Sequence, residues 1–66
     1  MNVKMLKGKM TEKGFNVERL AEQLGMNRST LYRKLNGGEK ITIGEATKIK
    51  NLLKLSNDDA RAIFFG

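Results

Sequence analysis

The sequence predicts one small all-α domain, and three observations support this. The chain has 66 residues, which is enough for a single thin hydrophobic core and no second one. Apolar residues recur every three or four positions along most of its length. Proline is absent, and glycine or helix-capping residues separate the periodic segments. We therefore expect a compact five-helix domain that spans residues 1–66.

The first helix is expected over residues 1–13, where Val3, Leu6 and Met10 recur at helical spacing. Gly14 follows directly, and glycine readily adopts the left-handed conformation that ends many helices. We therefore predict a break in the chain at Gly14.

The second helix is expected over residues 17–24, because Asn16 precedes it as a candidate N-cap and Gly25 follows it. A third helix, residues 28–35, begins after only one intervening residue and a second candidate cap, Asn27. Its inner stripe is predicted to be Leu31 and Leu35. That assignment leaves an outward face of Arg28, Ser29, Tyr32 and Arg33.

Two further helices are predicted in the second half of the chain. Thr42 and Glu45 have the three-residue spacing of a capping box, so the fourth helix begins there. Ser56 is placed to cap a last helix, residues 57–65, and two aspartates occupy its first turn, where the helix dipole favours negative charge.

Composition and charge exclude several classes of function. Histidine and cysteine are both absent, which removes imidazole bases, thiol nucleophiles, disulfides and the common zinc sites. An enzyme is therefore the weakest reading, and no cofactor or small-molecule substrate is implied. The net charge of +6 favours a polyanionic partner such as nucleic acid. The segment from Met26 to Lys40 contains four basic residues and only one acidic residue, Glu39.

The chain shows no apolar run of the roughly 18 residues that a membrane-spanning helix needs, and no signal peptide at its start. A membrane-surface role is disfavoured because the apolar stripes are needed for the core. We expect a cytoplasmic protein.

Residues 17–36 have the spacing of a helix–turn–helix. Ala21 is small enough for two helices to cross closely, and Gly25 tolerates the turn. The segment resembles the lambdoid-phage repressor and Cro type of helix–turn–helix, also called XRE-like. Three stretches carry the resemblance: Leu20-Ala21-x-x-Leu24-Gly25, Asn27-x-Ser29-Thr30-Leu31 and Asn36-Gly37.

The resemblance implies a lambda-repressor-like fold and a sequence-specific, double-stranded DNA-binding transcriptional regulator. Its third helix would enter the major groove, which is about 12 Å wide. The candidates for base reading are Asn27, Arg28, Ser29, Tyr32 and Arg33. The candidates for phosphate contacts are Asn16, Thr30, Lys34, Asn36 and Lys40. Relatives often carry Gln or Ser where Val17 stands, so that phosphate contact passes here to Asn16.

Each of these residues also has a structural reading. Asn16, Asn27 and Asn36 fit helix ends, and the charged residues fit a solvated helix face. Ile63, Phe64 and Phe65 fit either the monomer core or a homodimer interface. A dimer would predict a pseudo-palindromic operator, with recognition helices about 34 Å apart. The second functional hypothesis is a helical protein-interaction module, such as an antitoxin-like or adaptor domain.

Overall fold

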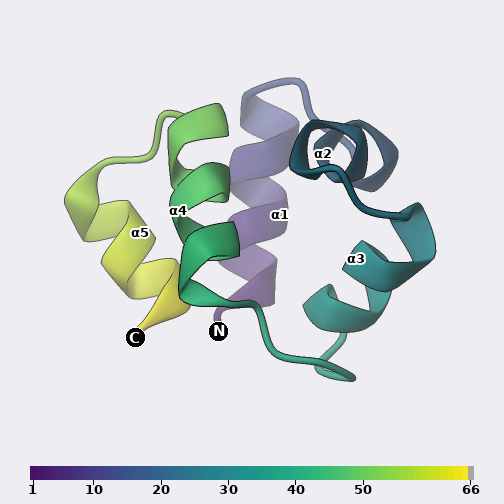
Figure 1. Ribbon diagram of the computed structural model, residues 1–66. Coiled ribbons are helices and arrows are strands. Elements are labelled where there is room, and N and C mark those ends of the chain that lie inside the picture. The colour runs from purple at the N-terminus through teal and green to yellow at the C-terminus, as the bar shows by residue number, and fades with distance from the viewer. Residues whose placement is uncertain (66) are drawn as a thin grey trace.

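A computed structural model describes residues 1–65 and confirms the five-helix prediction (Figure 1). Each helix lies within one or two residues of its expected bounds. The first begins at Val3 rather than Met1, because Asn2 caps it. In chain order, the helices are α1 (Val3–Glu12), α2 (Val17–Leu24), α3 (Arg28–Leu35), α4 (Ile43–Leu52) and α5 (Asn57–Phe64).

Side-chain caps begin every one of these helices except α3. The Asn16 side-chain oxygen accepts from the Arg19 amide at 2.7 Å, and the Ser56 hydroxyl accepts from the Asp59 amide at 3.0 Å. Thr42 and Glu45 form the predicted capping box in both directions. Asn27 has an extended backbone, but its side chain makes no capping hydrogen bond. Asn27 is therefore the N-cap residue of α3, as predicted, but the prediction that its side chain caps the first amides is wrong.

The first four helices end in the same way, with a residue of positive φ and an amide that reaches back five residues. Gly14, Gly25 and Gly37 supply this conformation after α1, α2 and α3, as glycine does at little steric cost. After α4 the position is held by Lys54, with φ of 51°. The reaching amides are Phe15 to Met10, Met26 to Ala21, Gly38 to Arg33 and Leu55 to Lys50.

The core lies where all five helices meet. α2 packs against α3 and α4, and α1 packs against α5. Lys9 of α1 also pairs with Asp59 of α5 at 3.1 Å, and this carboxylate raises the pKa of Lys9. The fully buried large side chains are Leu6, Leu20, Leu31, Leu35, Ile49, Leu53 and Ile63.

Ile63 belongs to this core and has no exposed surface. The backbone carbonyl of the same residue accepts a hydrogen bond from the Asn2 amide at 2.6 Å, which holds the start of α1 against α5. Of the two alternatives that the sequence left open for Ile63, the structure therefore shows the monomer core and not a dimer surface. Of the three candidate dimer residues, Phe64 is half-buried and Phe65 is exposed.

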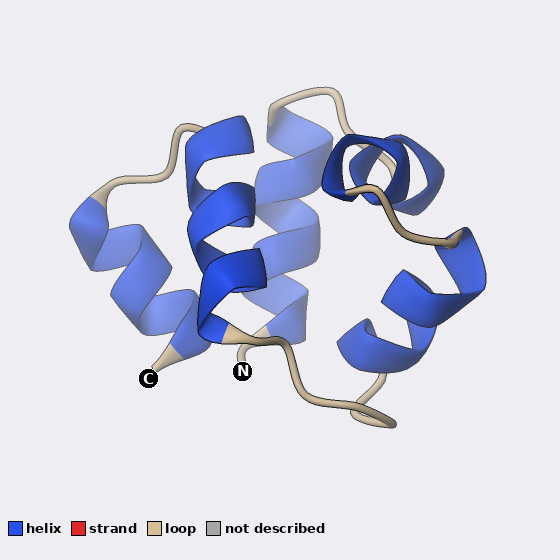
Figure 2. Cartoon of the chain, in the orientation of Figure 1, coloured by secondary structure: helices blue, strands red, loops and turns tan. Residues whose placement is uncertain are grey.

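The arrangement leaves α3 at one edge of the molecule. In Figure 1, α1, α4 and α5 stand beside one another, while α2 and α3 occupy the opposite side. Figure 2 shows that a long loop joins α3 to α4, whereas the connection from α2 to α3 is short. Within residues 1–65, no helix is long and apolar enough to cross a membrane.

Candidate nucleic-acid interface

The α2–α3 unit is built around a tight glycine turn. Gly25 adopts φ of 70°, and the following Met26 amide donates to the Ala21 carbonyl at 3.0 Å. Ala21 is buried, as expected where two helices cross closely. With α3 beginning at Arg28, the turn fixes the angle between the two short helices.

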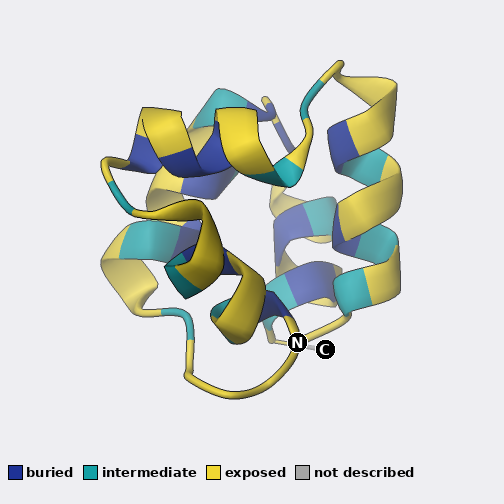
Figure 3. Ribbon diagram, turned by 90° about the vertical axis from the view of Figure 1, so that its right-hand side faces the viewer, coloured by how far each residue is buried: buried dark blue, intermediate teal, exposed yellow. Residues whose placement is uncertain are grey.

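α3 has one face in the core and one in solvent. Leu31 and Leu35 are buried, as the sequence predicted. Viewed from the side of α2 and α3, the outer surface of α3 is exposed along its length (Figure 3). That exposed set comprises Arg28, Ser29, Tyr32 and Arg33. The structure thus brings four base-reading candidates onto one accessible helix face.

Asn27, the fifth base-reading candidate, is exposed at the start of α3. Its side chain is not committed to a cap, so the carboxamide and the first amides of the helix face outward without a side-chain acceptor. Such a helix start is suited to negatively charged groups because of its free N–H groups and the helix dipole.

The phosphate-contact candidates fall into different environments. Asn16 uses its side-chain oxygen as the α2 cap, which leaves its NH2 group free to donate. Thr30 is half-buried in α3, and Asn36 is exposed as the C-cap of that helix. Lys40 is exposed in the loop between α3 and α4.

Lys34 differs from the other phosphate candidates because its side chain is only 10% exposed. Its ammonium lies 2.8 and 2.9 Å from the two carboxylate oxygens of Glu45. This hydrogen bond, together with one from the Thr42 amide at 2.9 Å, lowers the pKa of Glu45. In this structure the Lys34 ammonium is therefore engaged in an ion pair that joins α3 to the start of α4.

Both arginines of α3 also have acidic partners, which sequence reasoning missed. Arg28 lies 3.4 Å from Glu18 of α2, and Arg33 lies 3.3 Å from Glu39 of the following loop. These pairs depend on how the elements pack, and no local spacing rule indicates them. One available signal was the Gly37–Gly38 pair, because Gly37 adopts φ of 85° and the Gly38 amide returns to the Arg33 carbonyl.

The loop after α3 passes close to Arg33. The Gly38 amide donates to the Arg33 carbonyl at 2.8 Å. A Cβ atom at position 38 would lie 3.3 Å from that same oxygen, which is closer than most side-chain contacts. A glycine at this position therefore lets the loop fold tightly enough to bring Glu39 to Arg33.

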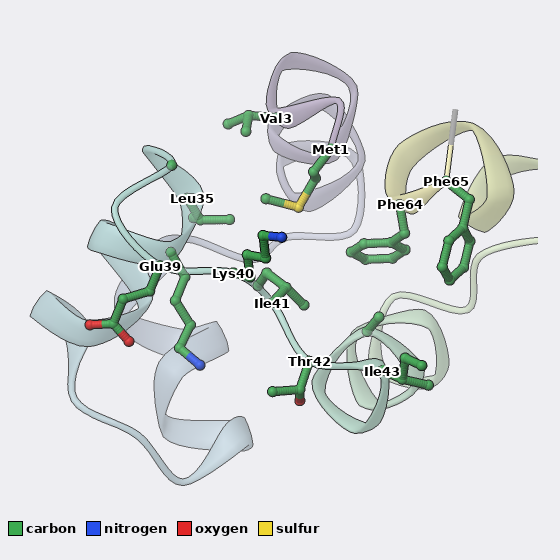
Figure 4. A pocket seen from close by; sticks show the side chains of 13 residues that line it. Met1, Val3, Leu35, Glu39, Lys40, Ile41, Thr42, Ile43, Phe64 and Phe65 are labelled. Carbon is green, nitrogen blue, oxygen red and sulfur yellow. The ribbon is translucent and has the colours of Figure 1, made fainter.

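An apolar groove of about 340 Å³ lies between the α3–α4 loop and the two ends of the described chain. Figure 4 shows Met1, Ile41 and Phe64 reaching into this region from three separate segments. At its margin, Ile43 is 77% exposed and Phe65 is 73% exposed. Large apolar side chains at this exposure mark a candidate contact surface.

Two short helices joined by a glycine turn, with a basic and accessible face on the second, define a helix–turn–helix DNA-binding domain. A family model agrees: the model described as bacterial regulatory protein, Fis family, matches residues 4–36, which form half of the chain. The chain belongs to this helix–turn–helix family. No curated protein and no solved structure matches it.

The family match settles the general function and leaves the narrower resemblance open. It runs from Lys4 in α1 to Asn36, the C-cap of α3, and so covers the whole helix–turn–helix. The chain is a DNA-binding transcription regulator in this broad sense. The matching model is of the Fis family and not of the lambdoid repressor and Cro type.

Proposed function

We propose that residues 1–66 act as one DNA-binding domain of a bacterial or phage transcriptional regulator, which reads a specific operator in the cytoplasm. The reading helix is α3, as in the lambdoid repressor and Cro proteins that the sequence resembles. The observation that carries the proposal is the exposed outer face of α3 within a family-matched helix–turn–helix. Occupancy of the operator, without a cofactor or small-molecule substrate, then excludes or recruits polymerase.

Arg28 and Arg33 supply base recognition in this proposal. A guanidinium group can donate two hydrogen bonds to the O6 and N7 atoms of guanine in the major groove. Both arginines are on the accessible face of α3, with Tyr32 between them. Asn27 and Ser29 add short polar side chains at the end of the helix that enters the groove first.

Phosphate contacts come from the groups that flank this helix. Lys40 forms no ion pair within residues 1–65, so its ammonium is available to the DNA backbone. Asn16, Thr30 and Asn36 offer side-chain donors near the ends of α2 and α3. These contacts orient the helix and give binding its dependence on salt.

The test is a selection from random DNA duplexes, followed by titration of the selected operator. Arg33→Ala is expected to weaken operator binding by about 1–3 kcal/mol and to relax the preference at one base position. Lys40→Ala should weaken all sequences alike and reduce the salt dependence. Arg61→Ala, which removes the same charge from α5, is the control and should bind like the unsubstituted chain.

Equal binding to every duplex would contradict sequence-specific reading. Tight binding to a protein partner with no DNA shift would instead favour a protein-interaction module.

A homodimer is the second part of this proposal. Phe65 and Ile43 are exposed beside the apolar groove, and this supports a contact with a second copy. Phe64 also lines the groove, but it is already half-buried within the single chain. The molecule measures 28 × 23 × 20 Å, so two touching copies can place their α3 helices about one DNA turn, about 34 Å, apart. Such a dimer predicts a pseudo-palindromic operator.

Sedimentation equilibrium of the free protein tests this contact. Phe65→Ser should shift a dimer toward monomer, whereas Tyr32→Ser, which removes an exposed aromatic ring from the DNA-facing side, should not. A monomer at all concentrations, together with a selected site lacking two-fold symmetry, would reject the dimer.

A further inference from the structure

We propose that Glu18 and Glu39 are specificity-determining residues of the DNA interface. Each carboxylate holds one α3 arginine in the free protein and disfavours contacts of that arginine with DNA phosphates. This inference rests on the proposed function, because it assigns a role to residues beside the same helix. Neither glutamate was singled out by the sequence for DNA recognition.

Both arginine–glutamate pairs are exposed to solvent. Arg28 is 69% exposed in its side chain and Arg33 is 62% exposed, and both glutamates are also well exposed. The distances of 3.4 and 3.3 Å are those of ion pairs that solvent reaches from several sides. Exposed pairs of this kind are weak and exchange readily, so DNA can displace the carboxylate.

The third basic side chain of α3, Lys34, forms an ion pair that is largely shielded from solvent. Lys34 and Glu45 form two short hydrogen bonds in a mostly buried site, and the Thr42 amide holds the same carboxylate. This pair remains intact when DNA binds the outer face. Only Arg28 and Arg33 are therefore free to change partners.

The three pairs alter the charge that DNA meets. α3 contains three basic residues and no acid, yet each of its basic groups is matched by a glutamate from another part of the chain. The positive charge of α3 is thus largely neutralised by neighbouring carboxylates, which weakens its non-specific attraction to DNA phosphates. A helix that attracts any duplex weakly depends more on contacts with the correct bases.

The exchange favours bases over phosphates for an electrostatic reason. An arginine that moves to a phosphate leaves its carboxylate beside the negatively charged backbone, and this repulsion occurs at every site along the DNA. An arginine that reaches guanine uses two of its five N–H donors there in fixed geometry and keeps the others for its carboxylate, which therefore stays paired in the operator complex. The carboxylates therefore penalise non-specific complexes more than the operator complex.

The experiment compares Glu18→Gln and Glu39→Gln with Glu22→Gln. Glu22 is also exposed on α2, but it forms no ion pair within residues 1–65, so its substitution changes the charge equally. Affinities for the selected operator and for a scrambled duplex are measured at several salt concentrations. Glu18→Gln and Glu39→Gln should each raise affinity for the scrambled duplex about 3- to 10-fold and for the operator less than about 2-fold. Thermal unfolding confirms that each variant is folded.

A double variant isolates the pairing from the charge. In an Arg33→Ala background, Glu39→Gln should change the operator-to-scrambled affinity ratio much less than it does in the unsubstituted chain. An equal fall of this ratio for Glu22→Gln, or an unchanged ratio for both Glu18→Gln and Glu39→Gln, would overturn the inference while leaving the proposed function intact. Failure of the unsubstituted chain to prefer any duplex would overturn the proposed function and this inference together.

Discussion

The two faces of α3 hold their residues in opposite ways. On the inner face, Leu31 and Leu35 are buried, and the Lys34 ammonium donates hydrogen bonds to both carboxylate oxygens of Glu45. On the outer face, Arg28 and Arg33 rest against glutamates in exposed pairs that solvent can separate. The difference shows how a helix of only eight residues can be fixed in position and still present side chains that change partners.

The inner face should be the most sensitive to substitution. Leu31→Ala leaves a cavity in the core and is expected to lower the free energy of unfolding by about 2–5 kcal/mol. Tyr32→Ala, one residue away on the outer face, should cost less than about 1 kcal/mol. Denaturant unfolding of both variants measures the contrast, and similar losses would contradict the assignment of the two faces.

The ion pair beneath α3 should be the next most sensitive feature. Glu45→Gln leaves the Lys34 ammonium in a mostly buried site without its charged partner, at an expected cost of about 1–3 kcal/mol at pH 7. The pKa of Glu45 is lowered in the folded state, so its charge stabilises the fold above the ordinary value of 4.5.

That stability is lost as the pH falls through the lowered pKa of Glu45. The difference in unfolding free energy between the unsubstituted chain and Glu45→Gln should therefore shrink on acidification. A difference that stays constant from pH 7 to well below the Glu45 pKa would argue against the ion pair as its source.

The helix starts give a smaller and more selective contrast. Asn16→Ala removes the α2 cap and should lower the unfolding free energy by about 1 kcal/mol. Asn27→Ala removes no capping hydrogen bond, so it should change the unfolding free energy by only about a few tenths of a kcal/mol. It should nevertheless weaken DNA binding. Equal losses of stability would show that Asn27 caps α3 in solution.

The smallest expected effect is at the end of α4, on the side of the molecule away from α3. Lys54 holds a left-handed conformation that glycine supplies after the other three helices. Lys54→Gly relieves this strain at the expense of a more flexible unfolded chain, and should raise the unfolding free energy by about 0.5 kcal/mol. Gly25→Lys is the converse control and should be destabilising.

Local spacing predicted most of the fold. The capping box at Thr42, the caps at Asn16 and Ser56, and the glycine ends of α1 to α3 all depend on neighbours within a few residues. Lys54 was not predicted, because no glycine marks that helix end. Asn27 was assigned a cap on residue type alone, whereas the side chain leaves the helix start open.

The site was harder to predict, because its charges are paired across elements. The outward set on α3 follows from helical periodicity, but the partners Glu18, Glu39 and Glu45 are brought to it by packing. Ile63 illustrates the same limit. The sequence left it open whether the monomer core or a second copy buries this residue, and only the packing of α5 against α1 shows that it is the core.

The hydrogen bond between Asn2 and Ile63 has a practical consequence for engineering. It holds the beginning and end of the described chain side by side, on a part of the molecule that α3 does not occupy (Figure 1). A domain with adjacent termini can be spliced into a surface loop of a host protein without stretching either partner. This helix–turn–helix domain is thus suited to insertion into a loop of another protein to direct it to DNA, as well as to conventional end-to-end fusion.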